Sequence, residues 1–287
     1  MFAIIGILVV VGAIIGGYLM EGGVLMVLMQ PAELVIIGGA ALGTLLIANP
    51  MPTIMALVKG LIGVMKGSRF NKALYLETLK MLNALFLSAR KNGATKLEAD
   101  VEDPHKSDTL NKFPGFLSDH HVVDFLCDTV RMSISGQMDP LSLDQMMELD
   151  MEVHHHELLE PIGALNAVAD SLPGLGIVAA VLGVVITMGS IGGPPAEIGH
   201  KVGAALVGTF LGILMCYGFL APLASNMTKI ADAESAYYNV LRVGIISYVK
   251  GNAPILCAEF ARRAVPHLVR PSFKEFEAAC KGGAAAA

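Results

Sequence analysis

The dominant pattern along the chain is a set of four long windows that contain no charged residue. They cover residues 1–20, 34–58, 171–196 and 202–228, and each ends at an acid or a lysine. A helix needs roughly 20 apolar residues to cross about 30 Å of hydrocarbon. The pattern therefore predicts an all-α, polytopic membrane protein with four transmembrane helices.

The second window contains the sequence Asn49-Pro50-Met51-Pro52. The 15 residues before it, 34–48, would form only about 22 Å of helix, which is too short to span a bilayer alone. We therefore expect the helix to kink at the prolines and to continue to about residue 65, with neighbouring helices satisfying the freed carbonyl groups.

The segments between and after the windows have the composition of a soluble, helical domain. Apolar periodicity predicts helices over 70–91, 143–170, 230–249 and 254–264, with Ser142 as an N-cap and Asn92-Gly93 as a helix end. A polar stretch, 94–112, follows this helix end and is expected to contain a turn at Asp103-Pro104.

The distribution of lysine and arginine predicts the orientation. Segment 59–170 has 11 of these residues and segment 229–287 has 8, whereas loop 21–33 has none and loop 197–201 has only Lys201. The positive-inside rule then places 19 of the 20 basic residues, and both termini, in the cytoplasm. The predicted order is TM1 1–20, a short periplasmic loop 21–33, TM2 34–58, a cytoplasmic helical domain 59–170, TM3 171–196, a short periplasmic loop 197–201, TM4 202–228, and C-terminal cytoplasmic helices with a tail 229–287.

Composition supports a membrane protein and argues against several other classes. Charged residues make up 16% of the chain, against about 25% in soluble domains, and the mean hydropathy is +0.62. A net charge of −5 argues against nucleic acid as a partner. The four isolated cysteines are typical of free thiols in a reducing compartment.

Catalytic and metal-binding motifs are missing from the sequence. His154, His155 and His156 are consecutive, so on a helix they point about 100° apart and do not face one ion. No phosphate-binding loop, zinc-protease motif or serine-hydrolase motif is present. We therefore expect no enzyme activity, no metal and no cofactor.

The predicted spans also lack an ionisable residue, although a proton or cation path through a membrane usually needs one. Either another chain supplies the titrating carboxylate, or the protein is a static scaffold. The polar groups that the spans do hold are hydroxyls, which line a path or bond back to their own helices: Thr44, Thr187, Ser190, Thr209, Tyr217 and Ser225.

Small residues and prolines mark two further features of the spans. Glycine pairs four residues apart predict close helix packing, within the chain or between chains: Gly12 and Gly16, Gly39 and Gly43, Gly208 and Gly212. Pro173 and Pro222 lie at a similar depth near the predicted cytoplasmic ends of the last two spans. Each removes a helix hydrogen bond, so each is either a hinge or a static kink.

Three stretches carry a resemblance to a known family. They are Ser171-Leu-Pro-Gly-Leu-Gly-Ile-Val-Ala-Ala-Val-Leu-Gly, Gly203-Ala-Ala-Leu-Val-Gly-Thr-Phe-Leu-Gly and Tyr217-Gly-Phe-Leu-Ala-Pro-Leu. With the order of spans and cytoplasmic segments, they make nearly the whole chain resemble the MotA family of flagellar stator proteins, within the MotA/TolQ/ExbB proton channel family.

The resemblance implies partners and an activity. MotA-type proteins form a homo-oligomer, a pentamer around two copies of MotB, in the lipid bilayer. MotB supplies the essential membrane aspartate, and proton flow drives torque on the rotor protein FliG.

The resemblance also implies roles for individual residues. Arg90 and Glu98 match the residues that engage FliG, and Pro173 and Pro222 match the two functional prolines. Ala180 and Thr209, with Tyr217, fall on the ion path, and Ala180 in place of a threonine resembles the proton-driven type.

An energy transducer of the ExbB/TolQ type is the second interpretation. That family resembles this chain in having a large cytoplasmic part, but it has three spans and an outside N-terminus. A static scaffold without ion flow is the third.

Overall fold

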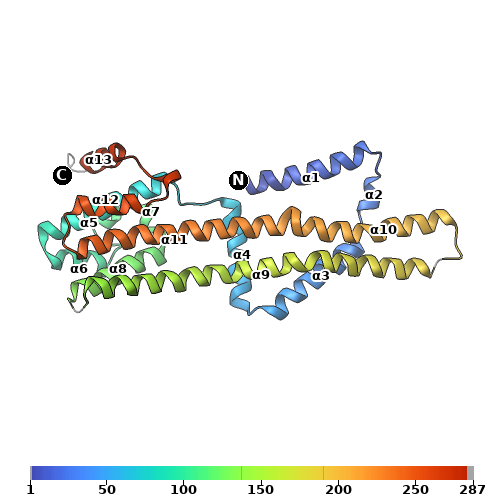
Figure 1. The fold of residues 1–287 in the computed structure, drawn as a ribbon, viewed down its shortest axis with the longest axis horizontal. Coiled ribbons are helices and arrows are strands. Elements are labelled where there is room, and N and C mark those ends of the chain that lie inside the picture. The colour runs from blue at the N-terminus through green and yellow to red at the C-terminus, as the bar shows by residue number, and fades with distance from the viewer. Residues whose placement is uncertain (1, 137, 190, 283–287) are drawn as a thin grey trace. The chain divides into compact units, whose positions relative to one another are not determined.

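A computed structural model describes residues 2–136, 138–189 and 191–282 (Figure 1). The described residues are overwhelmingly helical and contain no strand, which confirms the predicted all-α fold class. The chain forms two compact units. We call Met1–Gly67 with Glu157–Ile230 the apolar unit, and Ser68–His156 with Ala231–Ala287 the polar unit.

The apolar unit holds the four predicted apolar helices. Helical stretches long and apolar enough to cross a membrane occur at Phe2–Met20 and Leu25–Ala48, and within Pro140–Met188 and Pro195–Val249. Its elements are α1 (Phe2–Met20), α2 (Leu25–Leu28), α3 (Pro31–Ala48), α4 (Met51–Lys66), the second part of α9 (Pro140–Met188), α10 (Pro195–Ile213), a π-helical segment (Leu214–Leu220) and the start of α11 (Ala221–Val249).

The expected kink in the second window is instead a break. Asn49 and Pro50 adopt extended backbone, with ψ values of 143° and 157°, and separate α3 from α4. The Asn49 amide donates to the Leu45 carbonyl at 3.0 Å and so satisfies one group at the end of α3. Pro52 then lies in the first turn of α4, where its missing N–H is tolerated. The prediction of one continuous kinked helix is therefore wrong.

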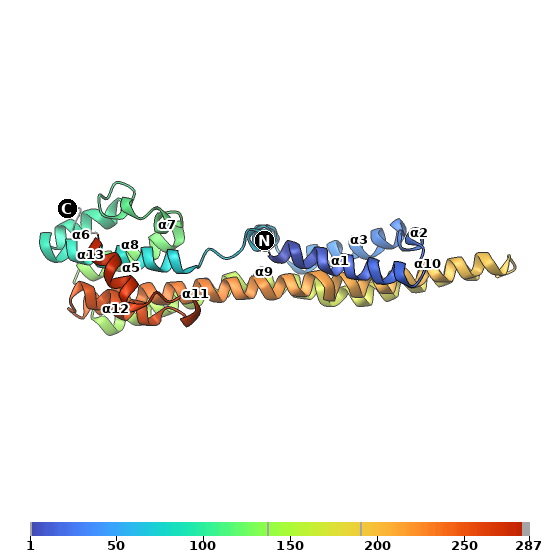
Figure 2. The same ribbon diagram turned by 90° about the horizontal axis from the view of Figure 1, so that it is seen from above.

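The polar unit has a conventional core of large side chains. It contains α5 (Lys72–Asn92), α6 (Ala94–Glu102), α7 (Pro114–Leu117), α8 (His120–Ile134), the first part of α9, most of α11, α12 (Pro254–Ala264) and α13 (Phe273–Gly282). Phe86 stacks on Tyr248 with ring centroids 4.3 Å apart, and the hydroxyls of Thr78 and Tyr237 lie 2.6 Å apart inside the core. Both ribbon views show α5, α6, α8 and α12 gathered together (Figures 1 and 2).

The local predictions for this unit are partly confirmed. Helix α12 has the expected bounds, and α5 ends at Gly93, whose φ of +85° suits glycine. Helix α9 begins before Ser142 because Asp139 accepts hydrogen bonds from the backbone N–H groups of residues 141 and 142, so Ser142 is not the cap. The polar stretch 94–112 contains α6, for which the sequence pattern predicts no helix.

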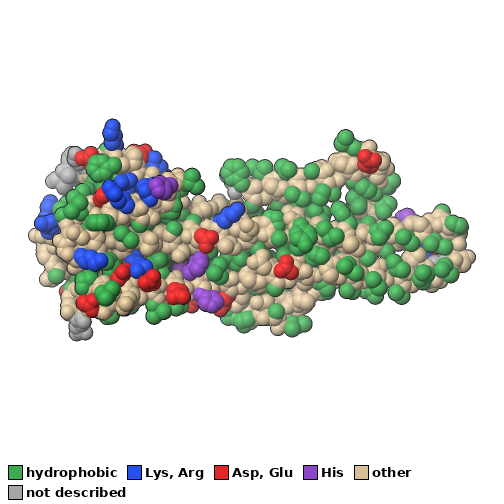
Figure 3. All heavy atoms as spheres, viewed as in Figure 1, with side chains coloured by type: hydrophobic (Ala, Val, Ile, Leu, Met, Phe, Trp, Pro, Cys, Tyr) green, Lys and Arg blue, Asp and Glu red, His purple; other side chains and the backbone are tan. Residues whose placement is uncertain are grey.

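The two units differ in their surfaces. On the face shown in Figure 3, hydrophobic side chains cover the apolar unit, and basic and acidic side chains gather over the polar unit. Large exposed apolar residues recur along α1 and α3, including Phe2, Leu8, Val35 and Ile47. Such a surface is suited to lipid or to partner helices rather than to water.

Candidate functional site

Helices α9 and α10 cross with their backbones in contact at three glycines. A methyl group on Gly212 would lie 2.5 Å from the carbonyl oxygen of Leu172 and 2.9 Å from the Cα of Gly176. A methyl group on Gly176 would lie 2.8 Å from the carbonyl oxygen of Gly208. Only glycine permits this approach, which confirms close packing at Gly208 and Gly212 and places it within the chain.

The other two glycine pairs behave differently. A Cβ on Gly12, Gly16, Gly39 or Gly43 would meet no heavy atom within 4 Å outside its own helix. The described part of the chain therefore gives these pairs no close neighbour, and they remain open to a second chain or to lipid.

Ala180 and Thr209 lie at the crossing of α9 and α10. A methyl group on Gly208 would lie 3.2 Å from the backbone nitrogen of Ala180, and one on Gly176 would lie 3.3 Å from the Cα of Thr209. The hydroxyl of Thr209 has no hydrogen bond to a described residue, so it is available to a ligand or to another chain.

The other span hydroxyls fall into different groups. Thr44 and Thr187 bond back to the carbonyls of Ala41 and Gly183, at 2.9 and 2.8 Å. Ser190 lies outside the described residues. Tyr217 is 68% exposed in the π-helical segment. It follows Thr209 by eight residues, about 12 Å along a helix, so the structure does not bring it against the Ala180–Thr209 pair.

The structure corrects the expectation that the spans hold no ionisable residue. Glu33 was assigned to the loop before the second span, but it lies in the first turn of α3 and is buried, with 8% of its surface exposed. Its Oε2 atom is buried without a hydrogen-bond partner. Glu33 falls outside the uncharged windows because an acid at the edge of an apolar stretch marks the end of a window.

The two prolines assigned as hinges lie in different helical surroundings. Pro173 lies inside α9, which continues through it without a break. Pro222 is the second residue after the π-helical segment Leu214–Leu220. A proline ring clashes with the carbonyl four residues earlier, here that of Gly218, and the wider π-turn accommodates this clash.

The two residues assigned to rotor contact are both exposed and lie on neighbouring helices. Arg90 is in the last turn of α5, and Glu98 is in α6, directly after the turn at Gly93. Neither side chain forms an ion pair with another residue in the described part of the chain. Both charges are therefore available to a partner.

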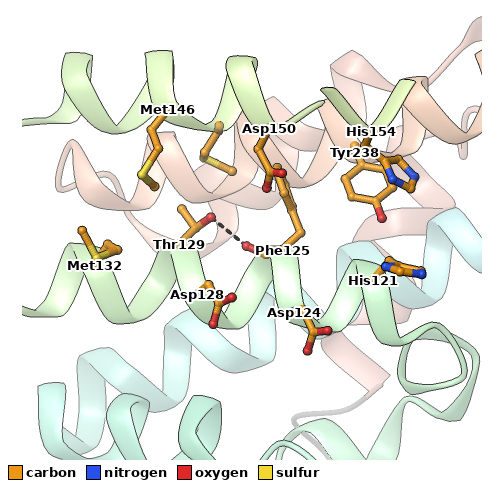
Figure 4. A pocket seen from close by; sticks show the side chains of 11 residues that line it. His121, Asp124, Phe125, Asp128, Thr129, Met132, Met146, Asp150, His154 and Tyr238 are labelled. Carbon is orange, nitrogen blue, oxygen red and sulfur yellow. Dashed lines mark hydrogen bonds between the residues drawn. The ribbon is translucent and has the colours of Figure 1, made fainter. Parts of the chain in front are cut away.

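A second polar site lies in the polar unit between α8, α9 and α11 (Figure 4). The cavity measures about 440 Å³, and its lining includes three carboxylates and two imidazoles: Asp124, Asp128, Asp150, His121 and His154. Burial raises the pKa of the adjacent Tyr238, whose hydroxyl has no hydrogen-bond partner among the described groups.

The histidine run adjoins this cavity. His154 lies 3.1 Å from Glu234 and His155 lies 3.9 Å from Asp232, while His154 also packs on the ring of Tyr238. Over residues 2–136, 138–189 and 191–282, no group of three or more potential metal ligands is arranged around one point. His154 and His155 each have an acidic side chain as a neighbour.

Comparison with known proteins identifies the family. A model of the Motility protein A N-terminal region matches residues 4–93, and a model of the MotA/TolQ/ExbB proton channel family matches residues 118–239. Motility protein A of Escherichia coli (strain K12) is 40% identical over 277 residues, which are 96% of this chain and 94% of that protein. The chain belongs to the Motility protein A family.

Other relatives and solved structures agree with membership of the Motility protein A family. Chemotaxis protein LafT of Vibrio parahaemolyticus is 35% identical and covers 95% of this chain and 96% of its own length. The structure of C. jejuni MotAB matches with a TM-score of 0.77 and 19% identity over 94% of this chain and 98% of that chain. The flagellar MotAB stator complex from Bacillus subtilis matches with a TM-score of 0.72 and 24% identity over 90% and 92% of the two chains. These two structural similarities show the shared fold.

The two relatives named above are a motility protein and a chemotaxis protein, and each matches this chain over nearly its full length. Membership of the Motility protein A family therefore favours the stator interpretation over an ExbB/TolQ-type transducer. Family membership and the four helices that are long and apolar enough to cross a membrane together support a multi-pass protein of the inner membrane.

Proposed function

We propose that this chain is a subunit of a flagellar motor stator that, together with MotB, forms a transmembrane proton channel and converts proton flow into torque on FliG. The observation that carries the proposal is 40% identity to a Motility protein A over 96% of the chain. The chain then acts as a channel and motor component and not as an enzyme.

The assembly that we propose is a pentamer around two copies of MotB in the lipid bilayer. The exposed apolar faces of α1 and α3, and the open glycines at positions 12, 16, 39 and 43, are suited to contacts with other helices. Both termini lie in the cytoplasm in this proposal, which rests on the 19 of 20 basic residues outside the two short loops.

The ion path that we propose passes Ala180, Thr209 and Tyr217, with the essential aspartate supplied by MotB. The unbonded Thr209 hydroxyl at the α9–α10 crossing supports this assignment. Pro173 and Pro222 couple protonation to movement of the polar unit, because each interrupts the hydrogen bonding of a long helix that enters both units.

The contact with FliG that we propose uses Arg90 and Glu98. Both are exposed and unpaired within the described chain, so a charged partner does not have to break an existing ion pair. Exposed ion pairs are worth at most about 1 kcal/mol and are screened by salt, which suits contacts that form and break with each step.

Deleting the gene tests the overall function. Cells with assembled flagella that do not swim, and that recover when the gene is restored, are the expected result. Normal swimming together with impaired iron uptake or envelope integrity would instead identify an ExbB/TolQ-type transducer. Normal swimming with neither defect would fit a scaffold.

Charge reversal tests the rotor contact. Arg90→Glu and Glu98→Lys are expected to reduce torque, with partial recovery when the facing charge on FliG is reversed. Lys112→Glu, at another exposed position of the polar unit, is the control. If both reversals match the control in torque measured on tethered cells, the rotor assignment is wrong.

The ion itself is tested by swimming speed. Speed should follow the proton gradient and should not change when sodium is replaced by potassium. Dependence on sodium would contradict the assignment based on Ala180 and Thr209.

A further inference from the structure

Among the Asp, Glu, Lys, Arg and His residues of the apolar unit, Glu33 is the one buried side chain in the part of the chain that the structure describes. It is 8% exposed, whereas the remaining acids, lysines and the histidine described in this unit are exposed or partly exposed. The mechanism proposed above does not use it. A buried ionisable group in a span is expensive and usually marks an ion pathway.

The Glu33 carboxyl group lies in a space that two glycines leave open. A Cβ on Gly208 would lie 2.6 Å from Oε2 of Glu33, and a Cβ on Gly183 would lie 3.6 Å from Oε1. A side chain at Gly208 would therefore occupy the position of the carboxylate. The same Gly208 position is 3.1 Å from the Cβ of Ala179 and 3.2 Å from the nitrogen of Ala180.

The neighbours of this carboxyl group are small and uncharged. Gly183 and Ala180 belong to α9, and Gly208 belongs to α10. No hydrogen bond reaches Oε2, and no described lysine, arginine or histidine forms an ion pair with Glu33. An ionised carboxylate without a partner in a low-dielectric surrounding is costly, so the site needs a proton, a cation or a bound water.

The same sequence elsewhere in the chain shows that position alone does not create this site. Both α3 and α10 begin with Pro-Ala-Glu, at residues 31–33 and 195–197. Glu197 is exposed and pairs with Lys201 at 2.9 Å, as an acid in a first helical turn commonly does. Glu33 has the same helix position but points into the gap between helices.

We infer that Glu33 is a proton-binding carboxylate that this chain itself contributes to the ion path, next to Ala180 and Thr209. The inference rests on the proposed stator function. A proton from a hydronium ion forms an O–H bond on Oε2, leaving water. The O–H bond then breaks and the proton passes to a water or to the carboxylate supplied by the partner chain, which restores the Glu33 carboxylate. No electron is transferred.

The test compares Glu33→Gln, Glu33→Asp and the matched control Glu197→Gln in the full complex with its MotB partner. The measurement is proton flux into vesicles that contain the complex, driven by an imposed pH gradient. Glutamine keeps the shape of Glu33 but binds no proton reversibly, whereas aspartate keeps the acid and shortens the side chain. A proton-binding role predicts that Glu33→Gln lowers proton flux by about tenfold, equivalent to about 1.4 kcal/mol on the limiting barrier. Glu33→Asp and Glu197→Gln should each retain a higher proton flux than Glu33→Gln.

A purely structural role predicts the opposite order. Glutamine would then be tolerated and aspartate would be harmful, and that order would overturn the inference. Wild-type flux in all three variants would overturn it as well. If the unsubstituted complex passes no protons, the proposed function fails rather than the assignment of Glu33. Flux that follows sodium at constant pH would contradict the proton as the ligand.

A second readout does not require the variants to conduct. Infrared difference spectra between acid and neutral pH are expected to show a carboxyl C=O component in the unsubstituted complex that is lost in Glu33→Gln and retained in Glu197→Gln, on top of the bands of the other acids. A C=O band of unchanged intensity in Glu33→Gln would overturn the assignment even if that variant conducts poorly.

Discussion

The apolar and polar units hold themselves together by different means. The polar unit buries large side chains such as Tyr75, Phe86 and Tyr237 in one core, as a protein in water does. The apolar unit exposes many of its large side chains, buries a smaller apolar cluster that includes Ile37 and Leu172, and brings backbones together at Gly176 and Gly212. Lipid is as apolar as leucine, so close contact and not exclusion from water stabilises the second unit.

Charge follows the same division. In the apolar unit, Glu197 and Lys201 form an ion pair at the start of α10. Pairs such as Arg242–Asp144 and Lys72–Glu275 belong to the polar unit. Four substitutions or conditions test this contrast, in decreasing order of expected effect.

Phe86→Ala should have the largest effect, because Phe86 is fully buried in the polar core and stacks on Tyr248. We expect a loss of about 3–5 kcal/mol in the free energy of unfolding of this unit. Urea titration of the purified protein, followed by tyrosine fluorescence, measures it. Leu149→Ala, at a position 61% exposed in the same unit, is the control and should cost much less.

Gly212→Ala should be next, because its methyl group would press on the Leu172 carbonyl and the Gly176 backbone. Overpacking of this kind costs about 1–3 kcal/mol. Thermal stability in detergent should therefore fall. On the same helix, Gly203→Ala meets nothing within 4 Å and should be neutral or slightly stabilising, since alanine favours helix. Equal losses in both variants would show that backbone contact does not hold this unit together.

Arg242→Met should have a smaller effect. Arg242 lies 2.6 Å from Asp144 and 3.3 Å from Glu148, and these acids are partly exposed. We expect a loss of about 1 kcal/mol at low salt. The difference from the unsubstituted protein should shrink in 1 M salt, where the screening length is about 3 Å. A loss independent of salt would indicate that packing of the arginine stem is responsible.

The smallest expected effect is a pH dependence of the packing of α13 in the polar unit. A hydrogen bond from Lys72, followed by hydrogen bonds at Ser272, lowers the pKa of Glu275 from 4.5 to about 2. Because the folded-state pKa is the lower one, the stabilisation is complete above about pH 4.5 and is lost as pH falls toward 2. Release of the C-terminal segment by pepsin should therefore rise across this range. Lys72→Met should weaken the pH dependence of pepsin cleavage. A cleavage profile unchanged by Lys72→Met would contradict the role of the Lys72–Glu275 pair.

The sequence predicts most of what depends on long patterns. Uncharged windows located four apolar helices, and periodicity gave the bounds of α12 and the end of α5 at Gly93. These features succeed because each is an average over many residues or rests on a strong local signal.

The sequence does not predict features that depend on one residue and its neighbours in space. Whether Asn49-Pro50 kinks or breaks a helix depends on how the freed groups are satisfied, here by the Asn49 amide itself. Gly176 contacts α10, although it forms no glycine pair at four-residue spacing with another glycine of its own helix. Glu33 and Glu197 both follow Pro-Ala, but Glu197 has Lys201 four residues on as a partner, whereas Glu33 lies against glycines of other helices, which its own segment does not predict.

The π-helical segment Leu214–Leu220 has one more consequence. A π-turn closes its hydrogen bonds over one residue more than an α-turn does, so the segment acts as a built-in insertion in the register of the helix. Residues after it face about 100° away from where an unbroken α-helix would direct them. Removing one residue from this segment would therefore rotate all of α11, from Ala221 to Val249, relative to α10, without changing any side chain in either helix.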